Sequence, residues 1–182
     1  MKRSFLLGCL LLICLAINAQ DTAKSQVEML EHSVFVTAGA NLNGGIEVSL
    51  GSEYFFNTNH TTSIYGLIDY HTAHGDDFER VFHFTKKAMA EIGARYYIPA
   101  VKSRFYPYIG LAATFGMQMI EKWGYDISRS ESAGYLFGGV GTIGLEYMLA
   151  RNVAVEAVAR IKYTDFDDDP YFIIGGGVKF YF

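Results

Sequence analysis

Apolar and polar side chains alternate with a period of two along most of residues 33–182. Successive side chains of a β-strand point to opposite faces, so this period predicts strands with one apolar face and one polar face. The segment 87–98 shows the pattern most clearly. Its apolar row holds Ala88, Ala90, Ile92, Ala94, Tyr96 and Ile98, and its polar row holds Lys87, Met89, Glu91, Gly93, Arg95 and Tyr97.

Eight segments with this pattern predict eight strands, and the run Asn41–Gly45 is a hairpin signal between the first two. The fourteen Phe, thirteen Tyr and nineteen Gly suit a strongly curved sheet. We therefore expect an all-β fold, an eight-stranded antiparallel up-and-down transmembrane β-barrel with an apolar wall and a polar interior. The strands are expected at about 33–40, 45–56, 62–71, 87–98, 106–120, 135–149, 153–163 and 172–182.

The first nineteen residues have the layout of a cleavable signal peptide. Lys2 and Arg3 precede an apolar run that is too short to span a membrane, and Ala19 offers a small residue for cleavage. A lipoprotein signal cleaved at Cys9 is the alternative. Because both cysteines lie in this segment, the mature chain is expected to have no disulfide. We divide the chain into a signal peptide (1–19), a periplasmic lead-in (20–32) and an outer-membrane barrel (33–182).

Two connections in the pattern are long and polar, namely Thr72–Arg80 and Glu121–Ser132. The connections after the second, fourth and sixth strands look short. Bacterial barrels have short periplasmic turns and longer extracellular loops, so the N-terminus is expected on the periplasmic side. Trp123, inside the second long connection, is expected at the membrane interface.

Charged residues on the polar faces would point into the barrel. Eight strands enclose a lumen that side chains just fill, and unpaired buried charge is costly, so we expect a mixed-sign network. Glu91 or Glu146 should pair with Arg95 or Arg160. The network would either plug the barrel and hold its register or line a narrow polar conduit. Its expected members are Glu91, Arg95, Glu146, Glu156, Arg160, Lys162 and Lys179.

The sequence contains no convincing catalytic, cofactor or metal site. Residues 139–144 match the dinucleotide fingerprint GxGxxG, but the strand periodicity that follows excludes the helix that this motif requires. The run Asp165–Asp169 lacks the turn glycine and closing glutamate of a calcium loop. The group His71, His74, Asp76 and Asp77 has no recognised ligand spacing either, and we interpret both groups as solvated loops.

Charge and histidine patterns argue against two further classes. Loss of Lys2 and Arg3 with the signal would change the formal charge from −4 to −6, which argues against direct binding of nucleic acid. His60, His71 and His83 have no serine placed as in the His-x-Ser motif of lipid A deacylases, so we expect no enzyme activity and no small-molecule substrate.

The last predicted strand is similar to the C-terminal strands that the barrel assembly machinery reads in outer-membrane proteins. It carries Val178, Phe180 and Phe182 in its apolar row. The resemblance implies that these three residues form an assembly signal, and that the assembly machinery and outer-membrane lipid are partners.

Short segments in six of the predicted strands together carry a resemblance to a known family. They are Val36–Gly39, Gly66–His71, Glu91–Tyr97, Tyr108–Ala113, Gly138–Gly141 with Leu145–Glu146, and Gly175–Phe182. In these segments the mature chain resembles the TraO family of conjugal-transfer proteins. That resemblance implies an outer-membrane component of a DNA-transfer apparatus that acts by position and contact, together with other subunits and without a cofactor. The alternatives are a stand-alone barrel of the OmpX or OmpA type, for adhesion or envelope integrity, and a lipid A-modifying barrel enzyme.

Overall fold

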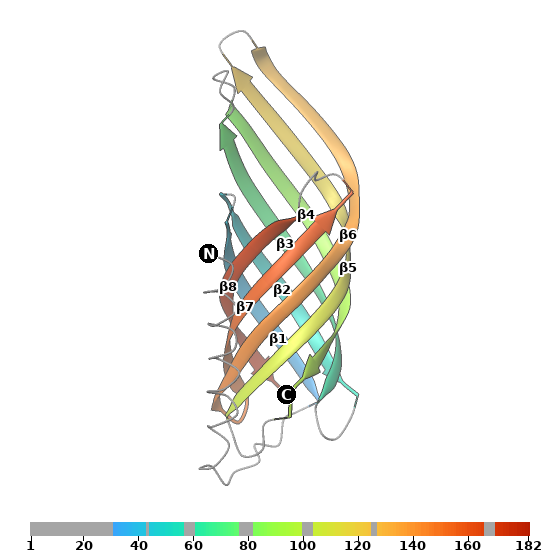
Figure 1. Ribbon diagram of the computed structural model, residues 1–182, viewed down its shortest axis with the longest axis vertical. Helices are drawn as coiled ribbons and strands as arrows, with labels where there is room; N and C mark the ends of the chain where they lie inside the picture. Colours follow the sequence, from blue (N-terminus) through green and yellow to red (C-terminus); the bar gives the residue numbers. More distant parts are fainter. Residues whose placement is uncertain are drawn as a thin grey trace, which may run out of the picture.

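The computed structural model describes residues 31–182 except 43, 57–60, 77–81, 100–103, 125–126 and 166–169. The expected signal peptide and nearly all of the lead-in therefore lie outside the described residues. In this part of the chain no helix is long and apolar enough to cross a membrane. The described elements are all strands (Figure 1): β1 (His32–Asn41), β2 (Ile46–Phe55), β3 (Thr62–Asp76), β4 (Phe82–Tyr97), β5 (Phe105–Gly124), β6 (Ile127–Ala150), β7 (Val153–Thr164) and β8 (Tyr171–Tyr181).

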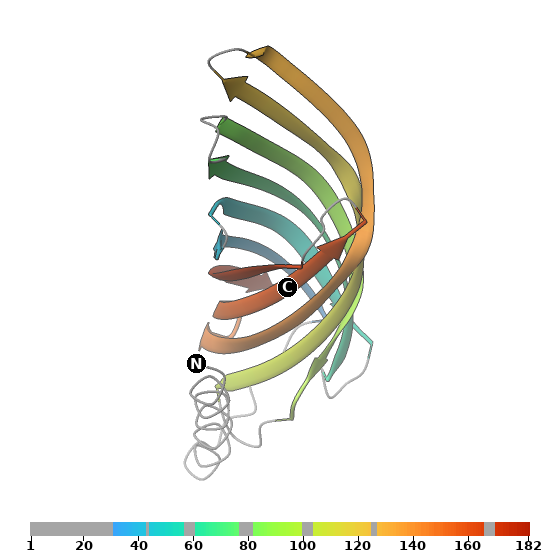
Figure 2. The same ribbon diagram turned by 45° about the horizontal axis from the view of Figure 1, so that its top comes forward.

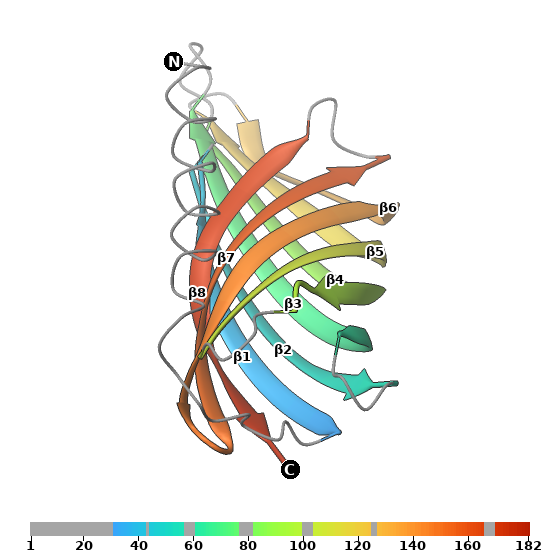
Figure 3. The same cartoon turned by 60° about the horizontal axis from the view of Figure 1, so that its bottom comes forward.

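The eight strands form one closed antiparallel barrel in chain order. Each strand pairs with the next, and β1 pairs with β8 over the register Ser33↔Tyr181 to Asn41↔Ile173. Figures 2 and 3 show the strands following one another round the wall from β1 to β8. The predicted fold class, an eight-stranded up-and-down barrel, is confirmed. We call the end where β1 begins and β8 ends the base, and the opposite end the top.

The two faces of every strand are those that the sequence predicts. On β2, for example, Glu47 and Glu53 are buried in the interior whereas Val48 and Leu50 lie exposed on the wall. On β5, Leu111 on the outer wall is 75% exposed. Interior side chains fill the bore, as an eight-stranded barrel requires. The wall is therefore apolar and the interior polar.

The strands differ strongly in length, so one side of the barrel is taller. β1 and β2 have 10 residues each, whereas β5 has 20 and β6 has 24. The hairpins β3–β4 and β5–β6 rise above the other four strands, and β5–β6 reaches highest in Figures 1 and 2. Four strands thus form a curved sheet that continues past the closed part of the barrel.

This extension overturns the predicted long loops. Most of Thr72–Arg80 and Glu121–Ser132 belongs to strands, and the connections are only 77–81 and 125–126. The connection after β4, residues 98–104, was predicted to be short and is longer. The ladder hydrogen bonds between neighbouring strands need no apolar pattern, so the strands continue where the alternation stops. Trp123 lies at a β5 position paired with Phe82, not in a loop.

The first hairpin turns at the predicted glycines. Gly44 and Gly45 have φ angles of 92° and 144°, a backbone conformation that other residues rarely adopt. The main-chain N–H of Asn41 donates to the carbonyl of Gly45 at 3.0 Å, which closes the turn. The hairpin signal in Asn41–Gly45 is therefore confirmed.

The seam between β1 and β8 depends on close backbone approach. A Cβ atom on Gly175 would lie 2.3 Å from the carbonyl oxygen of Ala38, and one on Gly177 would lie 2.3 Å from that of Val36. Backbone atoms cannot give way as a flexible side chain can. At the base, His32 and Phe182 exchange main-chain hydrogen bonds of 3.3 and 2.9 Å, which continue the seam past the last paired residues.

We expect Gly175→Ala to destabilise the barrel by about 1–3 kcal/mol, because the added methyl group pushes β1 and β8 apart. Gly66→Ala is the matched control, because a Cβ on Gly66 has only one neighbour within 4 Å, at 3.8 Å. Urea unfolding of the refolded proteins in lipid vesicles measures the difference. Equal midpoints for the two variants would contradict the role given to the seam.

Candidate functional site

Ten of the charged side chains that the described part of the chain buries form two groups along the barrel axis, and Lys87, which is also buried, lies apart from them over the ring of Tyr171. The lower group, nearer the base, joins Glu53 and Glu146 to Arg95 and Lys179, and it includes Glu156, which is bound to Tyr108. The upper group joins Glu47, Asp69 and Glu91 to Arg160 and Lys162. We call them the lower tier and the upper tier. Each tier holds three carboxylates and two cations.

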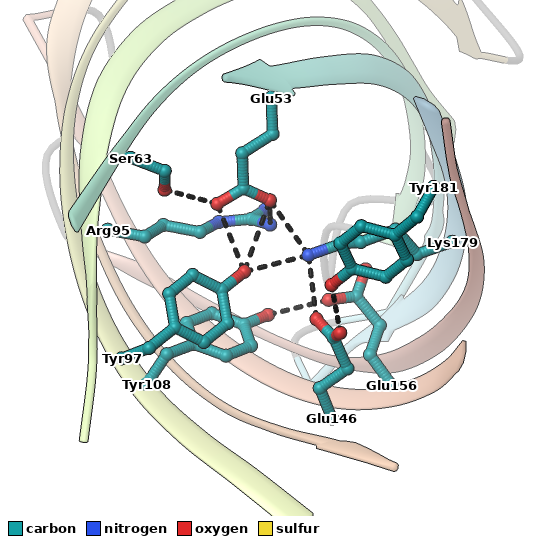
Figure 4. Close-up of polar contacts among 9 residues, drawn as sticks. All are labelled: Glu53, Ser63, Arg95, Tyr97, Tyr108, Glu146, Glu156, Lys179 and Tyr181. Atoms are coloured by element: carbon teal, nitrogen blue, oxygen red, sulfur yellow. Dashed lines mark hydrogen bonds and ion pairs between the residues drawn. The ribbon is translucent and has the colours of Figure 1, made fainter. Parts of the chain in front are cut away.

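Lys179 is the centre of the lower tier. Its Nζ donates to Glu53 Oε2 at 2.8 Å, to Glu146 Oε2 at 2.7 Å and to the Tyr97 hydroxyl at 2.7 Å (Figure 4). The side chain is fully buried. In the barrel β8 pairs with β1 and β7. Because Glu53 lies on β2 and Glu146 on β6, this one ammonium group links β8 to the strand beyond each of these neighbours.

Glu53 and Arg95 complete this side of the lower tier. Glu53 accepts hydrogen bonds from Ser63 and from Tyr97, and Arg95 Nη1 lies 3.1 Å from its Oε2. The guanidinium carbon of Arg95 lies 4.5 Å from the ring centre of Tyr65, and it also lies over Phe35 and Tyr108 at 4.7 and 4.9 Å. Cation–π contacts of this kind are strongest when desolvated, as they are here.

Glu146 and Glu156 are cross-strand partners on β6 and β7, so two buried carboxylates face each other. Glu146 has a cation, Lys179, and accepts a hydrogen bond from Tyr181. Oε2 of Glu156 accepts only from the Tyr108 hydroxyl, at 2.8 Å, and its Oε1 has no hydrogen-bond partner among the described residues. Like charges directly opposite each other are destabilising. Glu156 is therefore the surplus acid of the lower tier.

The upper tier is a tight cluster of shared ion pairs. Lys162 Nζ lies 2.7 Å from Glu47, 2.7 Å from Glu91 and 2.9 Å from Asp69. Arg160 bridges Glu47, at 2.6 Å, and Glu91. Oδ1 of Asp69 has no hydrogen-bond partner in the described part of the chain. The two strands β2 and β7, on different sides of the barrel, are thereby joined through its interior.

Apolar side chains fill the bore between and below the tiers. On β2, Gly51 lies between Glu47 and Glu53, and Phe35 and Leu67 occupy the part of the lumen that it faces. Atoms of these two side chains would lie 2.5 and 2.7 Å from a Cβ on Gly51. At the base, one buried cluster packs across the lumen. Its members are Phe55, Tyr97, Tyr108, Met148, Ala154 and Tyr181.

All seven residues of the expected network lie in the barrel interior. The structure brings Glu91 together with Arg160, as expected, but Arg95 pairs with Glu53, and Glu146 with Lys179. Sequence reasoning omitted three members of the network, Glu47, Glu53 and Asp69. The same alternation predicts that these three side chains point inward. It does not predict the register between strands that brings them next to the cations.

The glycines of the dinucleotide fingerprint lie within β6. Gly144 gives room to an aromatic ring, since a Cβ there would lie 2.3 Å from a ring carbon of Tyr108. A strand continues where the fingerprint needs a helix.

The other candidate groups also lack the arrangement of a site. His71 is buried in the upper interior with its ring 5.3 Å from that of Tyr171. Among the described residues, no group of three or more His, Cys, Asp or Glu side chains could hold a metal ion. His60 and the acidic run 166–169 lie outside the described residues, and only the backbone of His74, Asp76 and His83 is described.

The facing carboxylates give a matched pair of variants. We expect Glu146→Gln to destabilise the barrel by about 3–5 kcal/mol, because it removes half of the countercharge of the buried Lys179. Glu156→Gln should cost less than about 1 kcal/mol or stabilise the barrel, because it keeps an acceptor for Tyr108 and removes the repulsion. Urea unfolding in vesicles measures both. The reverse order of stability would show that Glu156 is not the surplus acid.

The barrel is similar to solved structures of small bacterial outer-membrane proteins. The N-terminal β-barrel domain of Pseudomonas aeruginosa OprF has a TM-score of 0.60 at 16% identity, covering 83% of this chain and 96% of that one. Neisserial surface protein A (NspA) has a TM-score of 0.59 at 17% identity, covering 83% and 96%. Ail, the attachment invasion locus protein of Yersinia pestis, has 0.54 at 15%, covering 84% and 100%. At these identities the likeness concerns the fold.

No curated protein matches the sequence at a significant level. A family profile does match, over residues 5–180, and it is described as "Protein of unknown function (DUF3575)". This match covers nearly the whole chain, including all eight strands but for the last residue of β8. The protein therefore belongs to the DUF3575 family, and within it folds as a closed eight-stranded barrel.

Proposed function

We propose that the protein is a structural, non-conducting barrel of the outer membrane. The observation that carries this proposal is the combination of an apolar wall with a filled ionic interior. Exposed Ile, Leu, Val, Met and aromatic side chains cover the outside of all eight strands. A water-soluble protein would bury such a wall, whereas lipid solvates it at no cost. The closed ladder leaves no strand edge within this band, which a bilayer requires.

The height of the apolar wall fits a bilayer. On β4, Tyr96 is exposed near the base, and Lys86 lies ten residues away on the same face. A rise of about 3.3 Å per residue and a tilt of about 40° separate them by roughly 25 Å, the height of the apolar band in outer-membrane barrels. Lys86 pairs with Glu121 at 2.7 Å, so charge returns to the wall at the upper limit of this band.

The filled interior favours a role by position and contact over transport or catalysis. Both tiers and the apolar clusters occupy the bore, and charge-paired side chains cannot move aside without leaving buried ions unpaired. The base then faces the periplasm, and the extension of β3–β6 stands above the membrane. This orientation agrees with the export signal expected at residues 1–19.

Within the envelope, we place the protein in a conjugative DNA-transfer apparatus, on the resemblance of its strand segments to the TraO family. The barrel assembly machinery would recognise the C-terminal strand and insert the barrel into the membrane. The extension of β3–β6 would contact other subunits. A stand-alone barrel for adhesion or envelope integrity is the second candidate. The fold shared with Ail and NspA favours it.

The purified barrel should show no channel events in planar lipid bilayers at neutral pH. The ion pairs of both tiers must all separate before a continuous water column can form. Single-channel recording measures this, with a porin as the positive control. Reproducible conductance steps from the wild-type protein would contradict a closed interior and show that the barrel is a narrow polar conduit.

Deletion of the gene in a conjugative donor should lower transfer frequency at least tenfold without slowing growth. Complementation with the wild-type gene is the control, and a mating assay on filters is the measurement. An unchanged transfer frequency, together with increased sensitivity to detergent, would assign the protein to envelope integrity instead.

A further inference from the structure

The longest strand of the barrel has an open edge above the closed wall. β6 pairs with β5 along its length, but its pairing with β7 begins only at Gly138↔Thr164. Within the described residues, no strand pairs with this edge of β6 between Ile127 and Leu136. Figure 1 shows β6 continuing upward past the end of β7, with β5 on one side and no ribbon on the other.

The last rung of the β6–β7 ladder is closed by a side chain. The N–H of Phe137 donates to the carboxylate of Asp165 at 2.7 Å, and the carbonyl of Phe137 accepts from the N–H of Asp165 at 2.8 Å. Main-chain groups of alternate residues point to the same side of a strand. The N–H and C=O groups of Tyr135, Ala133 and Glu131 therefore point to the open side.

This edge carries few of the features that protect natural sheet edges. Residues 127–136 contain no proline, and their charged residues are Arg129 and Glu131 near the tip; edge strands are usually blocked by proline, by charged residues, by bulges or by covering segments. The register shift opposite Lys122 and Gly124 affects only the tip, and residues 130–147 pair regularly with β5. The open edge is thus a regular row of donors and acceptors, about seven residues long below the tip.

We propose that the open edge of β6 binds an extended segment of another polypeptide, which adds to the sheet as a strand antiparallel to β6. Backbone N–H and C=O groups at this spacing are matched by an extended backbone. Such a segment takes the place that β7 would occupy if it were longer, so it continues the existing β6–β7 ladder without rearranging the barrel.

A second copy of this chain fits the edge poorly. Copies in one membrane share an orientation, so two β6 strands would run the same way and their tilts would make them cross. β3 offers the other open edge of the extension, but only over Ala73–Asp76, because its pairing with β2 ends at Ile46↔Thr72. The geometry therefore favours a different polypeptide. The open edge is a property of the extension alone, whereas the argument against a second copy rests on the membrane location proposed above, and neither rests on the conjugative role.

The probe is a fluorescent peptide that copies residues 115–123, the part of β5 that pairs with β6 on its other side. We expect saturable binding to the folded full-length barrel in detergent, measured by fluorescence anisotropy. Ala133→Pro should weaken binding at least tenfold, because it removes an N–H on the open side and leaves the β5–β6 ladder intact. Ala133→Val is the matched control and should bind like the wild type.

Two N-methylated peptides test the edge without changing the barrel. One carries methyl groups on alternate amides, which leaves the other edge of the peptide free to pair with β6, and the second carries methyl groups on every amide, which leaves no free edge. We expect the first to bind and the second to lose at least tenfold in affinity. Equal binding of both, or no binding of the unmethylated peptide to the wild-type barrel, would overturn the proposal.

Discussion

The closed ladder of backbone hydrogen bonds is the constraint on which the rest of the structure depends. A wall that faces lipid cannot leave N–H and C=O groups unpaired, and only a helix or a closed sheet pairs them all. In this chain closure comes from β1 and β8, whose glycines let the two backbones approach closely. Once the ladder is closed, the alternation of side chains decides which row forms the apolar outer wall and which row fills the bore.

Filling the bore with charge has energetic consequences that an apolar core would avoid. Each buried ion loses several kcal/mol of hydration and regains it only through well-placed partners. Lys179 has two carboxylates and a hydroxyl within 2.8 Å, and Lys162 has three carboxylates within 2.9 Å. Each of these cations joins distant strands, so the pairs select one register. A slip by one residue would turn every partner toward lipid.

The sequence predicts much of this fold because one period carries the information. It placed the inward and outward rows of all eight strands, including Glu146 and Lys179, since a strand permits only two directions for a side chain. It could not say that Arg95 meets Glu53 or that Glu156 faces Glu146. Those contacts depend on how far each strand is shifted along its neighbour. Across several strands these shifts add up, and the alternation of side chains does not reveal them. The extension of β3–β6 escaped prediction for another reason. Above the closed part of the barrel the strands enclose no bore, so the pattern fades although the ladder continues.

The junction of β1 with β8 joins the beginning of the barrel to its end, and this has a consequence for folding. A chain that is still folding can form hairpins, but it has no cylinder until β8 pairs with β1. Until that moment the edges of β1 and of the newest strand stay exposed, and both invite aggregation. Closure is thus an all-or-none event that waits for the last strand, and a helper protein that prevents aggregation before closure would have to shield both edges at once.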